Sequence, residues 1–383
     1  MSFSCKSNMT PRRILFGVVI IFLLFSLLTS FEITNSFDDK WPVKEWHLEK
    51  CNKQVLFLAD SLLNSPSISI AYKKILPPSG NKHDFLSMGP YWWPNPNSKD
   101  GLPYINRDGL VNPEVYNYND DHLYEEMVNA VNILARAYHQ TGDYRYSKRA
   151  AEYIDVFFVK RRTRMNPNLK YAQFVPGRRE GRAEGTITIS VLNPVLLASI
   201  GELEHSPNWP KSLKRKNHKW MRDFYHWITT HEYGVEASRR RNNIGTYYYY
   251  HILSLLKYMD EPEIAEAVIK ESVIPLIKEQ ISKDGAQHYE LERTKSFHYS
   301  LDNMKAILGI ADLSTELGVD LWGYEENGQC FIKSMIDFYV PYVKGEKQWE
   351  WEQIIPFYFS DLNVVFTKAA DHYGDTYSKY LIK

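Results

Sequence analysis

The stretch LYEEMVNAVNILARAYHQTGDYRYSKRAAEYIDVFFV, residues 123–159, decides the fold class predicted for this chain of 383 residues. In its first half, residues 123–140, apolar side chains recur every three or four positions, which is the spacing of one face of an α-helix. Thr141-Gly142-Asp143 then carries the signals that end one helix and begin another, and a second helical pattern follows over 144–159. The stretch therefore predicts a hairpin of two antiparallel helices.

Helical patterns of the same kind continue in pairs along the chain. Alternating apolar residues long enough for a sheet are scarce, and the nearest run, 186–189, leads into a helical pattern. Because the pairs follow one another without a self-similar sequence repeat, they favour a toroid over a tetratricopeptide-like array. We therefore predict an all-α fold, an incomplete (α/α) toroid of antiparallel helix hairpins. Besides a candidate first helix at 46–63, the predicted pairs are 187–204 with 216–230, 245–258 with 261–282, and 299–317 with 325–343.

Composition excludes some classes of function. The 46 Lys and Arg residues balance 46 Asp and Glu residues, and this zero net charge argues against a nucleic-acid-binding protein, which is normally basic. With 44% hydrophobic and 24% charged residues, the chain can bury a core. The 27 Tyr, 18 Phe and 10 Trp suit a large core and also suit stacking against sugar rings.

The N-terminal segment has the pattern of a targeting sequence. Lys6, Arg12 and Arg13 precede an unbroken apolar run at 14–28, as in a signal peptide or a signal anchor, and poor cleavage sites leave both open. We predict a tail with this targeting segment over 1–40 and a catalytic domain over 41–383. That domain is then secreted, extracellular or lumenal, either released or held by a single membrane anchor through residues 14–30.

The cysteines and histidines give no pattern of a metal site. The sequence has no CxxC or HExxH motif and no His-rich cluster, so we predict neither a metal nor another cofactor. Cys5 lies in the targeting segment. In an oxidising compartment Cys51 and Cys330 could pair, or both could be buried free thiols.

Three long connections, 75–118, 160–186 and 283–298, are unusual in a compact domain unless they are functional. The first is rich in proline, which excludes a helix and makes the segment irregular and semi-rigid. It also contains four Tyr and Trp side chains, whose rings could stack on sugars over a cleft or pack onto the rim of the toroid. These candidate substrate-binding residues are Tyr91, Trp92, Trp93 and Tyr104.

Several stretches together resemble the alginate lyase superfamily of α/α-toroid polysaccharide lyases, over roughly residues 55–350. Within it, the sequence looks more like the lyases acting on alginate or glucuronan-type chains than like the bacterial periplasmic alginate lyases. The resemblance implies cleavage of a 4-linked uronic-acid polysaccharide by β-elimination, with an anionic polysaccharide as the partner. The stretches that carry it are Asp84–Pro96, Asp100–Gly109, Val111–Glu114, Arg164–Gln173, Pro176-Gly177, Arg241–Tyr248, Asp284–Gln287, Glu290–Ser300 and Asp320–Tyr324.

The resemblance also implies three catalytic residues. Asn243 falls at the family's carboxylate-binding Asn, and Arg293 and Tyr299 fall at its Arg and its catalytic Tyr, in Arg-Thr-x-Ser-x-x-Tyr-Ser. These residue types suit the reaction. Asn243 and Arg293 can donate to the substrate carboxylate, and Tyr299 can take the C5 proton and return it to O4. Because an unperturbed Tyr has a pKa of about 10, Arg293 is expected to stabilise the phenolate.

One position departs from the family pattern. Where the family's Asn-Asn-His-Gly-Thr-type motif around Asn243 has His, this chain has Ile244, which can neither donate to a carboxylate nor act as a base. His251 lies about 10 Å further along the predicted helix, whereas His298 adjoins Tyr299 and His288 lies on the preceding loop. A tyrosine-only syn elimination, or a catalytically impaired glycan-binding homologue at the cell surface, are the alternatives that remain.

Acidic residues have other possible roles. Glu236 could orient Arg241 or Tyr299. A glycoside hydrolase on a similar toroid is a third alternative, and it would need two carboxylates flanking the bond, for which Asp120, Asp121, Glu184 and Glu236 are available. The remaining substrate-binding candidates are Asn168, Gln173, Arg178, Arg182, Tyr248 and His288, with Arg179 on the same basic loop.

Overall fold

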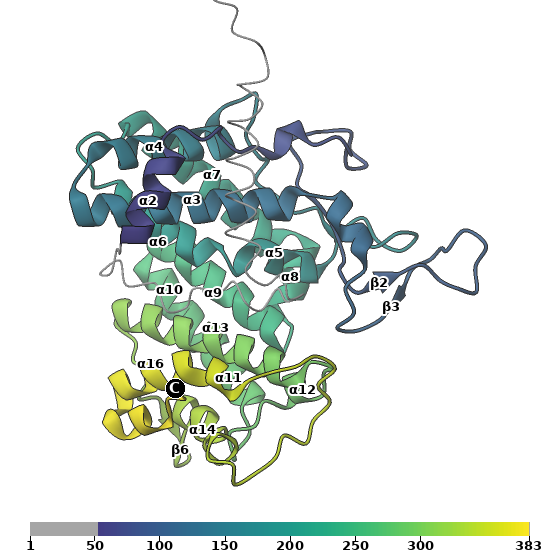
Figure 1. The fold of residues 1–383 in the computed structure, drawn as a ribbon, viewed down its shortest axis with the longest axis vertical. Coiled ribbons are helices and arrows are strands. Elements are labelled where there is room, and N and C mark those ends of the chain that lie inside the picture. The colour runs from purple at the N-terminus through teal and green to yellow at the C-terminus, as the bar shows by residue number, and fades with distance from the viewer. Residues whose placement is uncertain (1–52, 383) are drawn as a thin grey trace, which may run out of the picture. The chain divides into compact units, whose positions relative to one another are not determined.

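Antiparallel helices make up most of the computed structural model, which describes residues 53–382 (Figure 1). The prediction of an all-α fold is confirmed. The longer helices are α2 (Lys53–Leu62), α3 (Asp120–Thr141), α4 (Tyr144–Ile154), α6 (Asn193–Leu203), α7 (Lys211–Thr230), α8 (Glu232–Ser238), α9 (Asn243–Tyr258), α10 (Pro262–Val268), α11 (Ile274–Gln280), α13 (Ser296–Glu316), α14 (Phe331–Asp337) and α16 (Asn363–Tyr373).

Short elements connect these helices. The four-residue α-helices are α5 (Ile187–Ser190), α12 (His288–Leu291) and α15 (Val340–Val343). The strands form three two-stranded sheets, in which β1 (Leu86–Met88) pairs in parallel with β4 (Tyr171–Phe174), β2 (Trp92–Trp93) with β3 (Ile105–Asn106), and β5 (Glu325–Glu326) with β6 (Gln329–Cys330). The 3₁₀ and π turns are η2 (Ile70–Tyr72), η3 (Pro113–Asn117), η4 (Asp155–Val159), η5 (Ala183–Thr186), η6 (Ile269–Val273), η7 (Phe359–Leu362) and η8 (Asp375–Tyr380).

The hairpin predicted at 123–159 is present as α3 and α4. Gly142 ends α3 in a left-handed conformation, with φ of 67°, and the side chain of Asp143 accepts the backbone N–H of Arg145 to begin α4. These are the conformations that a helix stop and an N-cap require. The second helix continues through the π turn η4 to Val159, so both predicted boundaries hold within a few residues.

The first helices of successive hairpins pack on one another in a row, α3 on α6, α6 on α9, α9 on α13 and α13 on α16 (Figure 1). Helix α9 is buried on almost every side because it lies between α6 and α13. Gly309 of α13 allows this packing, since a Cβ there would come within 2.6 Å of the Tyr250 ring on α9. One helix of each hairpin thus builds an inner layer, as expected for an incomplete (α/α) toroid.

One predicted helix is partly wrong. The segment 325–343 does not begin as a helix, because β5 and β6 form a β-hairpin whose turn is Asn327-Gly328, both with positive φ. Asn-Gly is the strongest short signal for such a turn. The helical pattern resumes only at Phe331, in α14. The run 186–189, the nearest approach to a strand in the sequence, is helical.

The membrane anchor and the pairing of Cys51 with Cys330 both involve residues outside the described range 53–382 and stay predictions. Within that range Cys330 is half-buried, with Sγ 3.5 Å from the carbonyl oxygen of Trp322. The stretch Ala183–Leu203 is long and apolar enough to cross a membrane, but 67% of it is buried inside the helical body. This stretch is therefore a buried segment of the protein core.

Candidate active site

Tyr299 and Arg293 meet at the N-terminal end of α13. Tyr299 lies in the first turn of this helix and Arg293 in the turn that precedes it. The guanidinium carbon of Arg293 lies 4.0 Å from the centre of the Tyr299 ring. A cation at this distance over a ring is attracted to its π-face, and it would stabilise a negative charge on the phenol oxygen.

The aromatic loop, defined here as residues 89–118, contacts both of these residues. The Tyr299 hydroxyl donates to the Tyr91 hydroxyl at 2.7 Å. Arg293 donates through Nε and Nη2 to the two carboxylate oxygens of Asp108, at 3.1 and 2.7 Å. Asp108 also accepts the backbone N–H and the hydroxyl of Thr294, at 3.4 and 3.0 Å. Four donors therefore fix Asp108, and Asp108 in turn fixes the guanidinium plane.

Burial dominates the protonation state of Tyr299. It raises the pKa of Tyr299 far above the ordinary value, and the neighbouring Tyr91 adds to this, while Arg293 lowers it by a smaller amount. The sequence correctly predicted the direction of the Arg293 effect on the phenol. It did not predict that burial would outweigh it, and the resting side chain is a neutral phenol.

Asn243 is the first residue of α9, and Glu290 joins it to the Arg293 turn. The Asn243 side chain is almost completely buried, and its amide makes no hydrogen bond within residues 53–382. Its backbone N–H donates to Oε1 of Glu290, three residues before Arg293. Gly245 permits this start of the helix, because a Cβ there would lie 2.0 Å from the carbonyl oxygen of Arg240. No hydrogen bond between described residues joins Asn243 directly to Tyr299.

Glu290 is a residue of the site that sequence reasoning missed. Its side chain is 1% exposed, and Oε2 has no hydrogen-bond partner among the described residues. Burial raises the pKa of Glu290 to about 8, against the smaller opposing effects of the Asn243 N–H and the Arg293 cation. The Glu-Leu-Glu-Arg stretch was quoted for the family resemblance, but nothing in the sequence distinguished Glu290 from Glu292.

A Glu290→Gln variant is expected to lose less stability at alkaline pH than the wild type. The folded chain keeps the Glu290 proton until about pH 8, whereas the unfolded carboxyl loses it near its ordinary pKa of 4.5. Between these values the folded state binds more protons, so the free energy of unfolding falls as the pH rises. The thermal midpoint is followed by circular dichroism between about pH 5.5 and about pH 9. Over this range the midpoint of the variant should fall by a few degrees less than the midpoint of the wild type. Glu263→Gln, at an exposed position of α10, should follow the wild type; equal losses in all three proteins would contradict the assignment.

Two of the predicted arginines lie close to the ring of Trp92. The guanidinium carbons of Arg178 and Arg182 lie 5.2 and 5.8 Å from its ring centre. Gln173, which has a φ of 52°, accepts Nη2 of Arg182 at 2.6 Å. Burial lowers the pKa of Arg182, and the carboxylate of Glu184 opposes this. These predicted residues therefore do come together.

The other predicted sugar contacts are engaged with the protein. Trp93 donates Nε1 to the carbonyl oxygen of Leu110 at 2.9 Å, and the Tyr104 hydroxyl donates to Glu114 at 2.7 Å. Asn168 lies 3.5 Å from Asp84 through its amide. Tyr248 is 5% exposed and packs edge-on against Tyr249, which leaves little of its surface for a sugar.

The three histidines considered as substitutes for the motif's His differ in exposure. His251 is fully buried, hydrogen-bonds to Ser190 and Asn193, and has a pKa lowered by burial to about 3, so it is a neutral core residue. His298 is also buried and lies 2.7 Å from Gln353 through Nδ1. Only His288, at the start of α12, is exposed among these three.

Three of the four carboxylates available for a hydrolase are paired with cations, and Asp121 accepts the backbone N–H of His122. Arg240 bridges Glu184 and Glu236, at 2.9 and 2.7 Å, and Asp120 is buried against Lys73. The prediction that Glu236 orients Arg241 is wrong, because Arg241 pairs with Glu279 at 2.8 Å. No two of the four candidate carboxylates in the described range stand as a free facing pair, and the hydrolase alternative has no structural support.

Comparison with known proteins gives a consistent result. A family model described as alginate lyase matches residues 69–349. An alginate lyase from Bacteroides ovatus superposes with a TM-score of 0.80 at 28% identity, over 89% of this chain and 91% of that one. Alginate lyase A1-III from Sphingomonas species A1 superposes at 0.54 with 16% identity, over 86% and 89%. Alginate lyase A1-III complexed with a tetrasaccharide superposes with a TM-score of 0.58 at 17% identity, over 86% of each chain. At such identities the last two support the fold alone. No curated protein matches the chain.

Proposed function

The chain belongs to the alginate lyase family, and from this premise we propose that Tyr299, Arg293 and Asn243 cleave a 4-linked uronic-acid polysaccharide by β-elimination. The family and the fold together support the coarser statement, a polysaccharide lyase acting on a uronan. The observation that carries the assignment of residues is the position of the Arg293 guanidinium 4.0 Å over the Tyr299 ring.

The reaction needs one proton to move from carbon to oxygen. The C5–H bond breaks, its electron pair forms the C4=C5 double bond, and the C4–O4 bond breaks. The oxygen leaves with a proton, so that one product carries a 4,5-unsaturated uronide and the other a new reducing end. C5–H is acidic only while the charge developing on the C6 carboxylate is stabilised, and such stabilisation is usually the largest catalytic contribution.

Each of the three residues has a role in that step. The buried Asn243 amide, which has no partner among the described residues, donates to the carboxylate. Arg293 keeps Nη1 for the substrate, because only Nε and Nη2 bind Asp108. Tyr299 acts as base in its phenolate form, which forms by loss of the hydroxyl proton to water and is stabilised by the Arg293 guanidinium; it takes the C5 proton, gives that same proton to O4 and ends again as the phenolate.

A single tyrosine favours one stereochemistry. When the same phenol removes the C5 proton and protonates O4, both must lie on one face of the sugar ring, as they do in mannuronate and glucuronate. Guluronate has the opposite configuration at C5. We therefore propose a mannuronan or glucuronan type of chain as the substrate, bound beside Trp92, Arg178 and Arg182.

The alternative is a catalytically impaired glycan-binding homologue at the cell surface. Ile244, half-buried in the first turn of α9 next to Asn243, supports it. An aliphatic side chain removes the donor that the motif's His would supply at the carboxylate. The two proposals differ in product and not in binding.

The expected result for residues 41–383 is an increase in ultraviolet absorbance from the conjugated 4,5-unsaturated product. Polymannuronate and glucuronan should give this product, and polyguluronate should give it at least about tenfold more slowly, because its C5 proton lies on the other face. New reducing ends without the absorbance would contradict a lyase. Binding to the polymers without either product would favour the impaired homologue.

We also propose that residues 1–40 direct the catalytic domain 41–383 out of the cytosol. The basic residues before the apolar run 14–28 support export. Whether the run is cleaved or retained as an anchor determines whether the enzyme is released or stays at the membrane.

A further inference from the structure

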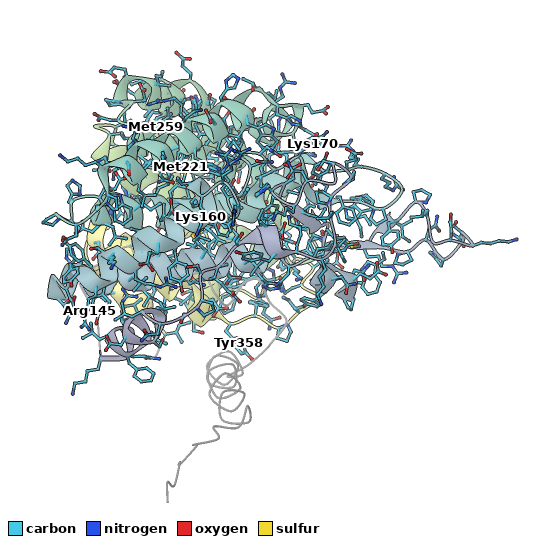
Figure 2. The ribbon with its side chains drawn as sticks, turned by 90° about the horizontal axis from the view of Figure 1, so that it is seen from above. Arg145, Lys160, Lys170, Met221, Met259 and Tyr358 are labelled. Carbon is cyan, nitrogen blue, oxygen red and sulfur yellow. The ribbon has the colours of Figure 1, made fainter. Side chains whose placement is uncertain are left out.

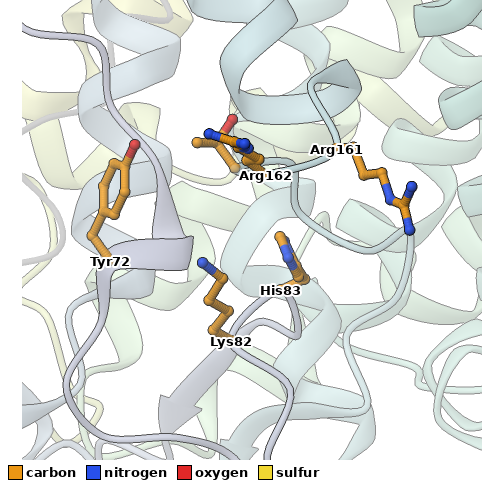
Figure 3. Close-up of a pocket in the computed structure, with 6 residues that line it drawn as sticks. Tyr72, Lys82, His83, Arg161 and Arg162 are labelled. Atoms are coloured by element: carbon orange, nitrogen blue, oxygen red, sulfur yellow. The ribbon is translucent and has the colours of Figure 1, made fainter.

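A cationic cavity of about 620 Å³ lies apart from the residues described above (Figure 3). Figure 3 shows Tyr72 at one end and Arg161 at the other, with Lys82, His83 and Arg162 between them. The lining comes from η2 and from the two loops that precede β1 and β4. The residues that line it are Tyr72, Lys82, His83, Arg161, Arg162 and Thr163.

The cations of this cavity have no acidic partners among the described residues. Lys82, Arg161 and Arg162 are exposed, and none forms an ion pair within residues 53–382. Asp84 is the acidic residue next to them in sequence, but it is buried and accepts hydrogen bonds from Ser79 and Asn166, at 2.7 and 2.8 Å. Lys74, Lys160 and Arg164, close in sequence to the cavity residues, are also exposed and form no ion pairs in that range. On a chain with zero net charge, this is an uncompensated positive patch.

The two loops are fixed to each other and to the neighbouring elements. The Ser69 hydroxyl donates to the carbonyl oxygen of Thr163 at 2.6 Å. His83 hydrogen-bonds through Nδ1 to the carbonyl oxygen of Arg164 at 2.6 Å, and the Asn166 N–H donates to the carbonyl oxygen of His83 at 2.8 Å. The positive side chains therefore project from a cross-linked backbone, which reduces the entropy lost when a ligand binds.

Strands β1 and β4 connect this cavity with the active site. The strands are parallel, the cavity loops precede both of them, and Tyr91 and the Arg182 partner Gln173 lie at or beyond their carboxyl ends. From His83 to Tyr91 the chain runs eight residues, which span at most about 26–29 Å when fully extended. One polymer chain could reach from one place to the other.

We propose that this cavity is a second binding site for the carboxylates of an acidic polysaccharide, outside the catalytic centre. The identity of the polyanion rests on the proposed function; the positive patch does not. Several carboxylates spaced along one polysaccharide chain match several exposed cations spaced along the two loops. Tyr72, which is 70% exposed at the edge of the cavity, offers a ring on which a sugar can stack. A small inorganic anion would make no use of that ring.

The first test measures binding without turnover, in the Tyr299→Phe background. A triple variant, Lys82→Gln/Arg161→Gln/Arg162→Gln, is compared with a control of equal charge change, Lys53→Gln/Lys148→Gln/Lys347→Gln, at exposed cations without ion pairs in the described range. Polymannuronate affinity, measured by calorimetry, should fall about tenfold in the first triple variant and much less in the control, since each exposed charge contributes only a small part of the binding. Tyr72→Ala should weaken binding further, and the affinity should depend less on salt once the three charges are gone.

A second test separates this proposal from the proposed function. In the Tyr299 wild-type protein, the first triple variant should raise KM for the polymer and leave KM for a trisaccharide unchanged. If uronans bind but no unsaturated product forms, the lyase assignment fails and the binding site stands. If both triple variants bind the polymer equally, the site is refuted. Tighter binding of inorganic phosphate or single-stranded DNA than of polymannuronate would also overturn it.

Discussion

A Tyr299→Phe variant is expected to lose at least about a thousandfold in kcat on polymannuronate. The substitution removes a single oxygen atom and keeps the ring under the Arg293 guanidinium, 4.0 Å away. It eliminates the atom that must both accept the C5 proton and protonate O4. A positioned proton transfer contributes about 10²–10⁴-fold, and here one hydroxyl performs two such transfers. KM should change little, because the hydroxyl bonds to Tyr91 and not to a carboxylate-binding group.

Tyr249→Phe is the matched control for this experiment. Tyr249 is a half-buried tyrosine on α9 whose hydroxyl donates to the Ser238 carbonyl oxygen at 3.2 Å, outside the proposed machinery. Both variants lose one hydroxyl hydrogen bond, which is worth about 1 kcal/mol of stability. Their thermal midpoints should therefore be similar while their activities differ. A Tyr299→Phe protein with the activity of the control would refute the catalytic role.

The helix hairpins could be predicted because each inner helix is buried over a long stretch. In α9 the apolar pattern reflects contact with α6 on one side and α13 on the other, so the pattern and the packing have one cause. The prediction was partly wrong at 325–343, because the helical spacing of apolar residues there was taken to continue across Asn327-Gly328. Both residues of this turn have positive φ, which a helix does not allow. The Asn-Gly pair by itself predicts the β-hairpin.

The site was predictable only where its parts are close in sequence. Arg293 and Tyr299 are only six positions apart and lie on either side of the start of α13, so their backbones are necessarily close. Asp108 binds Arg293 across 185 positions of sequence, a separation at which one sequence carries no signal of contact. Glu290 is close in sequence to Arg293, but its importance comes from its burial and from the hydrogen bond donated by the first residue of α9, and both depend on the tertiary fold.

An Arg293→Lys variant is expected to lose about a hundredfold in kcat/KM, although it keeps the positive charge. The guanidinium uses Nε and Nη2 on the two oxygens of Asp108 and covers the Tyr299 ring at the same time. A lysine ammonium is a point charge and cannot hold this geometry. Loss of one preorganised donor at a developing charge costs about 10²–10³-fold. Initial rates of formation of the unsaturated product at several polymer concentrations measure this loss.

Arg145→Lys provides the control, because Arg145 also donates through Nε and Nη2 to an aspartate, Asp143, at 2.9 and 2.6 Å. Arg145 lies at the start of α4, and Figure 1 shows α4 on the opposite side of the helical body from β2 and β3. Figure 2 labels Arg145 at the edge of the same body. The Arg145→Lys variant should retain full activity.

An Asp108→Asn variant tests what Asp108 does for Arg293. Because Thr294 also holds Asp108 through two donors, the carboxylate is an anchor for the guanidinium, and its loss should lower kcat about tenfold with little change in KM. A fall in KM instead would mean that Asp108 occupies the place of the substrate carboxylate, and unchanged kcat/KM in Arg293→Lys would remove Arg293 from the mechanism.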